Sequence, residues 1–199
     1  MLKASLAASH AILRQYEWVE TTVASVKGEE KSRKQERCYY GVDGGLQKVL
    51  LSQTTAPQKK RRLFGKVIAA KKQEELMNYM QEAIALVKMY VPPDQGRIQA
   101  AKDAGRLVIA PQGWQQAKLI FSDYIKVGDN LALDVDLASN RPAHAKVTTY
   151  VDSPSEPVTL DVSFSQLDNG ATYASSVLLE AKSKKVTVHL QNSGYRRLN

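Results

Sequence analysis

The segment LALDVDLA at residues 131–138 decides the fold, because leucine and valine alternate there with alanine and aspartate. Successive side chains of a β-strand point to opposite faces, so this alternation predicts a strand with one apolar face and one polar face. The segment VTLDVSF at 158–164 repeats the pattern, and weaker versions occupy 147–151 and 186–190. Together the four segments predict an antiparallel sheet that keeps one side dry.

Turn signals divide the rest of the C-terminal half into further strands. The breaks are rich in glycine, proline, asparagine, aspartate and serine, and they recur about every 8–12 residues. This spacing is typical of sandwiches, barrels and half-barrels. Strands are expected at 113–125, 130–138, 143–152, 157–167, 172–182 and 185–191.

The N-terminal part predicts a helix followed by a meander. Residues 2–14 have leucines near one helix face, and residues 16–26 are rich in the aromatic and β-branched side chains that favour strands. The segment DGG at 43–45 is a hairpin signal between two further strands, which are expected at 35–42 and 46–52.

The strongest helical signal covers residues 66–91, where apolar side chains recur at spacings of four and three. Pro92 and Pro93 end this helix, and a second helix is expected over 94–104. The two helices form a helical insertion of about 66–104 between the two groups of strands. The apolar stripe of the first helix consists of Leu76, Met80, Ile84 and Val87.

The order of elements predicts the architecture. Strands flank the helical insertion on both sides, and no Pro- or Gly-rich linker divides the chain, so we expect one domain over 1–199. The simplest packing belongs to the α+β class: a curved antiparallel sheet, forming an open half-barrel, with a helical lid over its concave face. Whether side chains fill the space below the lid is not encoded in the pattern.

Four passages carry a resemblance to a known family. FSDYIKVGDNLALDVDLAS (121–139) places an Asp-Tyr pair before a Gly-Asp turn, and VTLDVSFSQLDNGATY (158–173) ends in an Asp-Asn-Gly turn. NSGYRR (192–197) and CYYGVDGGLQKVLLS (38–52) have the character of a terminal strand and an early hairpin. These passages resemble the periplasmic lipoprotein carriers of the LolA/LolB-like superfamily. The basic helical part departs from that family, so no functional residue of the family is carried over.

The resemblance implies an open β-barrel with a helical lid, a bacterial periplasmic location and an apolar cavity for lipid or lipoprotein acyl chains. It also implies that a signal peptide is missing from the sequence as given. Burial of one methylene contributes about 0.8 kcal/mol, so such a cavity needs apolar walls. A stripe of this kind also forms ordinary protein core, and that interpretation stays open. The expected walls are Leu76, Met80, Ile84, Val87, Leu119 and Phe121.

Positive charge is concentrated in the first half of the chain. Residues 1–105 hold 18 basic against 11 acidic residues, whereas residues 106–199 hold 10 against 9. The segment 59–72 contains no acidic residue and can meet anionic lipid head groups, a membrane surface or nucleic acid. A solvated loop and helix start explains it equally well. The expected head-group or membrane contacts are Lys59, Lys60, Arg61 and Arg62.

The sequence holds no motif of a catalytic, metal or cofactor site. A phosphate-binding loop, a His-Glu-x-x-His motif, a Cys-x-x-Cys motif and a Gly-x-Ser-x-Gly elbow are all missing from it. The three histidines are isolated, and Asp134 and Asp136 are interpreted as a solvated strand face. Cys38 lies in an alternating strand and is expected to be a buried structural thiol. We therefore expect no enzyme, no metal and no cofactor.

Three functions are compatible with these patterns. The preferred one is non-enzymatic binding of acyl chains by a monomeric, carrier-like protein of the bacterial envelope. The alternative is a protein-interaction or ligand-sensing domain of the same fold in envelope stress signalling, with an envelope protein as its partner. Nucleic-acid binding through 59–72 is the least favoured, because Phe64 is the only aromatic residue there that could stack on bases.

Overall fold

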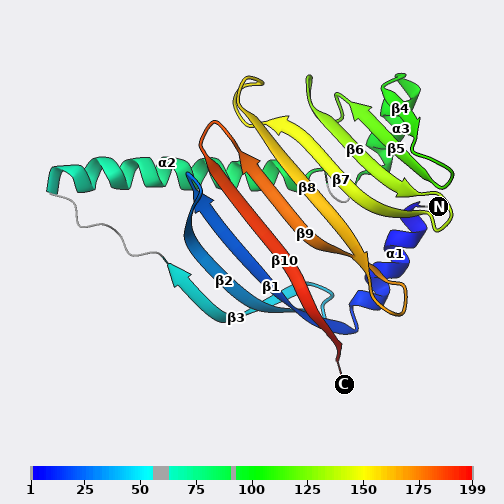
Figure 1. The fold of residues 1–199 in the computed structure, drawn as a ribbon, viewed down its shortest axis with the longest axis horizontal. Coiled ribbons are helices and arrows are strands. Elements are labelled where there is room, and N and C mark those ends of the chain that lie inside the picture. Colours follow the sequence, from blue (N-terminus) through cyan, green and yellow to red (C-terminus); the bar gives the residue numbers. More distant parts are fainter. Residues whose placement is uncertain (1, 56–62, 91–92, 199) are drawn as a thin grey trace.

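The structure is a computed structural model that describes residues 2–55, 63–90 and 93–198. Ten strands form one antiparallel sheet in the order β3-β2-β1-β10-β9-β8-β7-β6-β5-β4, with β3 and β4 at its two edges (Figure 1). The sheet is open and curved, which confirms the predicted fold class. The strands are β1 (Tyr16–Val26), β2 (Glu29–Tyr40), β3 (Leu46–Thr55), β4 (Leu107–Pro111), β5 (Gln116–Ser122), β6 (Asn130–Asp136), β7 (Arg141–Tyr150), β8 (Pro157–Gln166), β9 (Thr172–Ala181) and β10 (Val186–Arg197).

Three helices, α1 (Leu2–Leu13), α2 (Leu63–Lys88) and α3 (Gln95–Asp103), contact the same side of the sheet, which we call the helix-facing side. In Figure 1, α2 passes behind the strands. Near α1, the Ser9 hydroxyl accepts a hydrogen bond from the Thr172 backbone N–H at 3.0 Å, and the His10 ring lies 5.0 Å from the Tyr40 ring. None of the helices, over the residues that are described, combines the length and apolarity needed to cross a bilayer.

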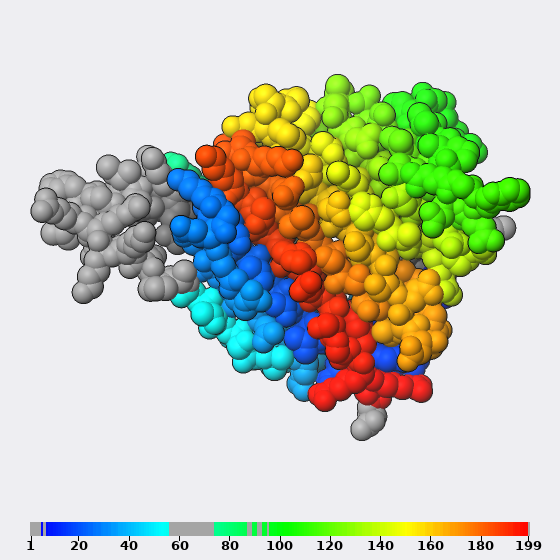
Figure 2. Space-filling model, viewed as in Figure 1, coloured from blue at the N-terminus to red at the C-terminus, as the bar shows by residue number. Residues whose placement is uncertain are grey.

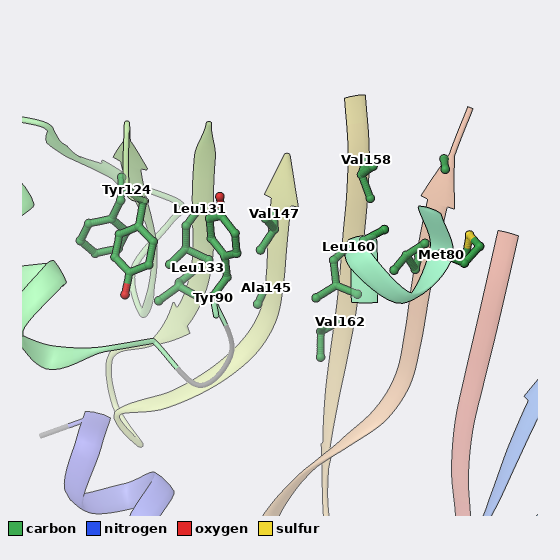
Figure 3. Packing of buried hydrophobic residues seen from close by; sticks show 14 of the residues in the cluster. Met80, Tyr90, Tyr124, Leu131, Leu133, Ala145, Val147, Val158, Leu160 and Val162 are labelled. Carbon is green, nitrogen blue, oxygen red and sulfur yellow. The ribbon is translucent and has the colours of Figure 1, made fainter. Parts of the chain in front are cut away.

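The hydrophobic core lies between α2 and the centre of the sheet. The alternating segment of β6 is buried as its sequence predicts, with Leu131, Leu133 and Val135 exposing 0%, 2% and 6% of their surface. Figure 3 shows Met80 of α2, and Tyr90 just beyond its end, on the same side of the strands as Leu131 and Leu133. Large apolar side chains of β7, β8 and β9 continue the core across the sheet. Burying such side chains supplies the main favourable free energy of folding.

A buried carboxylate fixes the end of α2 to the sheet. Asp129 exposes 3% of its surface and accepts hydrogen bonds from the backbone N–H groups of Tyr124, Ile125 at 2.9 Å and Lys126 at 2.7 Å. The hydroxyl of Tyr90 donates to the same carboxylate at 2.6 Å and also lies 2.8 Å from the Thr149 hydroxyl. Burial, followed by the neighbouring Asp129, raises the pKa of Tyr90, so the phenol stays protonated and able to donate.

Several element boundaries differ from the sequence-based expectations. The strand expected at 113–125 is present but shorter: β5 covers only Gln116–Ser122, because Gly113 has φ 87° in a turn that separates β4 from β5. β4 was not among the strands expected from the sequence. β2 begins at Glu29 instead of residue 35, because cross-strand pairing with β1 holds its polar first half in the sheet. β10 continues to Arg197 past a bulge at Gly194, which has φ 64°.

We predict that Asp129→Asn lowers the free energy of unfolding by about 3 kcal/mol, because it removes a charged acceptor from several buried donors. Urea denaturation of both proteins measures the difference. The exposed Asp168→Asn is the matched control and should change stability by no more than about 0.5 kcal/mol. Equal effects of the two substitutions would contradict the role given to Asp129.

Candidate functional site

An apolar row crosses the helix-facing side of the sheet from β4 to β10. Each member lies directly opposite the next on the neighbouring strand. Strands are about 4.8 Å apart, so the row is about 29 Å long. One leaflet of a bilayer has about 15 Å of hydrocarbon, so an extended acyl chain is shorter than the row. The row consists of Ile109, Leu119, Leu133, Ala145, Val162, Val177 and Leu190.

The middle of the row is covered and its ends are not. Leu133, Ala145 and Val162 are buried, whereas Val177 is half-buried. Ile109 exposes 60% of its surface although it lies on the apolar side, next to the half-buried Leu119. The helices therefore leave part of the apolar side of the sheet in contact with solvent. Exposed apolar surface of this kind is a common feature of ligand and partner sites.

Five of the sequence-predicted wall residues belong to one core cluster or pack against it. Met80 and Phe121 are buried in the core cluster, and Leu76, Ile84 and Leu119 are half-buried against it. The side chain of Val87 lies outside the described residues, as do Lys59, Lys60, Arg61 and Arg62. The five described residues thus face the apolar side of the sheet together.

Side chains fill the space between α2 and the sheet. Tyr79, Met80 and Ala83 of α2 are all buried against the strands. Two hollows are described, with volumes of about 440 and 360 Å³, and polar residues line most of both. Neither is lined by the stripe of α2. An occupant of the middle of the apolar row would consequently have to displace side chains of α2.

Beyond β10, the helix-facing side becomes polar. Glu20 and Glu36 lie opposite each other on β1 and β2, and both are buried. Two lysines neutralise the pair: Lys48 contacts Glu20 at 2.5 Å and Lys34 contacts Glu36 at 2.6 Å. Two adjacent carboxylates repel each other unless cations lie close to them. Charge pairs therefore stabilise the helix-facing side at β1 and β2. The apolar row ends at β10, next to these charged residues.

Cys38 lies beside these charges and is a buried thiol, as the sequence predicts. Desolvation by burial, followed by the negative charge of Glu20, raises the pKa of Cys38 to about 11. A thiol is nucleophilic only as the thiolate, so the raised pKa and the lack of access both suppress its reactivity. The structure gives Cys38 a packing role.

We predict that Cys38 reacts slowly with Ellman's reagent at pH 8. The raised pKa alone lowers the thiolate fraction roughly a hundredfold relative to a free thiol, and burial slows the reaction further. The rate should rise at least by this factor in a denaturing concentration of urea, with Cys38→Ser as the blank. Equal rates in the folded and unfolded states would show that the thiol is accessible and activated.

On the outer side of the sheet, His144 lies between two carboxylates, a cluster that the sequence analysis missed. Its Nε2 lies 2.6 Å from Asp161, and its Nδ1 lies 3.4 Å from Asp134. Lys118 contacts Asp134 from the next strand at 3.3 Å. The three partners come from β5, β6 and β8, so the register alone brings them together and no sequence spacing could show it. No group of three His, Cys, Asp or Glu residues within the described ranges is arranged to hold a metal ion.

Comparisons with known proteins give similar structures at low sequence identity. No protein-family model matches the chain, and no curated protein matches it. A LolA superfamily protein from Nitrosomonas europaea aligns with a TM-score of 0.41 and 11% identity, covering 100% of this chain and 94% of that chain. A putative outer membrane lipoprotein-sorting protein domain from Vibrio parahaemolyticus aligns with a TM-score of 0.38 and 12% identity, covering 100% and 92%.

A DUF1329 family protein from Desulfovibrio piger aligns with a TM-score of 0.36 and 9% identity, covering 98% of this chain and 92% of that chain. Identities of 9–12% transfer no ligand and no partner. The order of the strands and the position of the helices establish the fold class independently of these similarities.

Proposed function

We propose that this protein binds an acyl chain of a lipid or lipoprotein, without catalysis, along the apolar row of the helix-facing side. The observation that carries the proposal is the incomplete cover of this side, where Ile109 is exposed and Leu119 and Val177 are half-buried. Each methylene that leaves water on binding contributes about 0.8 kcal/mol, so an acyl chain that places several methylenes against the row binds with useful affinity.

In this proposal, α2 is the lid. Its polar attachment lies at its C-terminal end, where Tyr90 is bonded to Asp129 and Thr149. Along Leu76, Met80 and Ile84 its contacts with the sheet are apolar, and an acyl chain can replace apolar contacts without leaving a polar group unsatisfied. Methionine suits such a wall, because its unbranched side chain adapts to different shapes.

The cellular role that follows is a carrier-like protein of the bacterial envelope, acting in the periplasm as a monomer. The basic residues Lys59, Lys60, Arg61 and Arg62 would then meet anionic lipid head groups or the membrane surface; they lie outside the described residues, and this contact stays a prediction. An envelope protein that delivers or receives the lipid would be the natural partner.

We predict that Ile109→Glu weakens binding of a fluorescent fatty acid by about tenfold or more, because a charge on the apolar row must be desolvated by the bound chain. Fluorescence titration of the purified protein measures the dissociation constant. Val108→Glu is the matched control: Val108 is adjacent, exposes 56% of its surface and pairs with Ile120 on the outer side.

The control should bind like the parent protein. If both variants bind equally, the row is not the site. If neither the parent protein nor the variants bind the probe, the exposed apolar residues are better explained as a docking surface for a protein, which is the alternative function.

A further inference from the structure

Two hairpin turns that are far apart in the sequence form a basic hollow at one end of the sheet. The β1–β2 turn and the β9–β10 turn lie side by side in Figures 1 and 2, in blue and orange-red, and the backbone N–H of Lys27 donates to the carbonyl of Lys185 at 2.7 Å. The hollow between them has a volume of about 440 Å³. It is lined by Lys27, Gly28, Glu180, Lys182, Lys185, Val186 and Thr187.

We propose that this hollow binds a phosphate-bearing anion. Three lysines line it against one carboxylate, that of Glu180, so its walls carry a net positive charge. A hollow lined by one sign of charge concentrates ions of the opposite sign. The hydroxyl of Thr187 and the backbone at Gly28 add uncharged groups that can hydrogen-bond to phosphate oxygens.

The backbone of the turns supports a ligand role over a simple solvated surface. Lys27 has φ 56° and Lys185 has φ 54°, a left-handed conformation in which glycine, asparagine and aspartate are the usual residues. Lysine occupies both of these positions, and both lysines are exposed. A Cβ atom added at Gly28 would meet nothing within 4 Å, so the backbone there is open to an approaching ligand.

Lys184, which lies in the same β9–β10 turn, is not one of the residues that line the hollow. Its Nζ lies 2.9 Å from Glu156 and 5.1 Å from the ring centre of Tyr79, so it serves the contact with α2. The side chains of Glu180 and Thr187 lie opposite each other on the outer side of the sheet. The hollow is consequently separate from the apolar row, and its occupancy does not depend on acyl-chain binding.

The test uses the full chain, isotopically labelled, and two sources of the same chemistry. Inorganic phosphate is titrated while the amide resonances of Gly28, Lys185 and Thr187 are followed by NMR. Sedimentation with phosphatidylcholine vesicles, with and without about a third phosphatidylglycerol, tests a lipid head group. A response to phosphate alone assigns a soluble ligand, and a response to the anionic vesicles alone assigns a head group. Either response supports the site when the lysine substitutions below weaken it.

Variants localise the binding. The triple variant Lys27→Gln, Lys182→Gln, Lys185→Gln should weaken binding by about tenfold or more, since each lysine adds to the attraction of an anionic ligand. Glu180→Gln should strengthen binding at least about twofold, a gain that general damage to the fold cannot produce.

The matched control removes the same charge from exposed positions elsewhere, through Arg97→Gln, Lys102→Gln and Lys146→Gln. It should retain most of the binding. Equal losses in the two triple variants would overturn the proposal. So would unchanged resonances of Gly28, Lys185 and Thr187 with phosphate together with no extra sedimentation with the anionic vesicles.

Discussion

The position of α2 depends on one buried carboxylate. Asp129 accepts hydrogen bonds from backbone N–H groups of the turn between β5 and β6 and from the hydroxyl of Tyr90. The Tyr90 hydroxyl is also hydrogen-bonded to the hydroxyl of Thr149 on β7. A buried carboxylate is tolerable only when several donors surround it, so the turn, the end of the helix and the strand must come together. The C-terminal end of α2 is therefore fixed to the sheet, and the helix packs over the apolar residues of β6 to β9.

This attachment explains how the sheet is divided between packing and exposure. Near the fixed end, Tyr90 and the helix-facing side chains Leu131 and Val147 are fully buried, and stability comes from apolar contact. Toward β1 and β2, the same side is held by the pairs Glu20–Lys48 and Glu36–Lys34. Between these regions and at the β4 edge, apolar side chains remain partly open. A chain of methylenes matches such a surface, because it needs contact area and no polar partner.

The sequence predicts the strands with strict alternation best. β6 and β8 are found close to their expected bounds because their pattern and their burial coincide. The polar first half of β2 and the short β4 were missed, since each is held by pairing with a neighbour and not by its own pattern. The stripe of Leu76, Met80 and Ile84 was placed correctly on the apolar side, because the helical period fixes which residues share a face.

Sites that depend on register lie beyond sequence reasoning. The contacts of His144 with Asp134 and Asp161, the apolar row and the lysine-lined hollow all join residues from strands or turns that are separated in the chain. A one-residue shift in a strand that contributes to one of these sites would move its side chains to the other side of the sheet and disrupt that site. Their composition is visible in the sequence, but their assembly is decided by the pairing.

The most direct measurement of the central claim is methyl NMR of the protein with a bound fatty acid, followed through intermolecular NOEs, which arise only between protons in close contact. Acyl-chain binding at the apolar row predicts NOEs from the fatty acid to the methyl groups of Leu119, Val177 and Met80 on the helix-facing side. The methyl groups of Val108 and Leu178, which lie on the outer side by their pairing with Ile120 and Asp161, should show none. Equal NOEs to both sides, or none to either, would contradict acyl-chain binding at the apolar row.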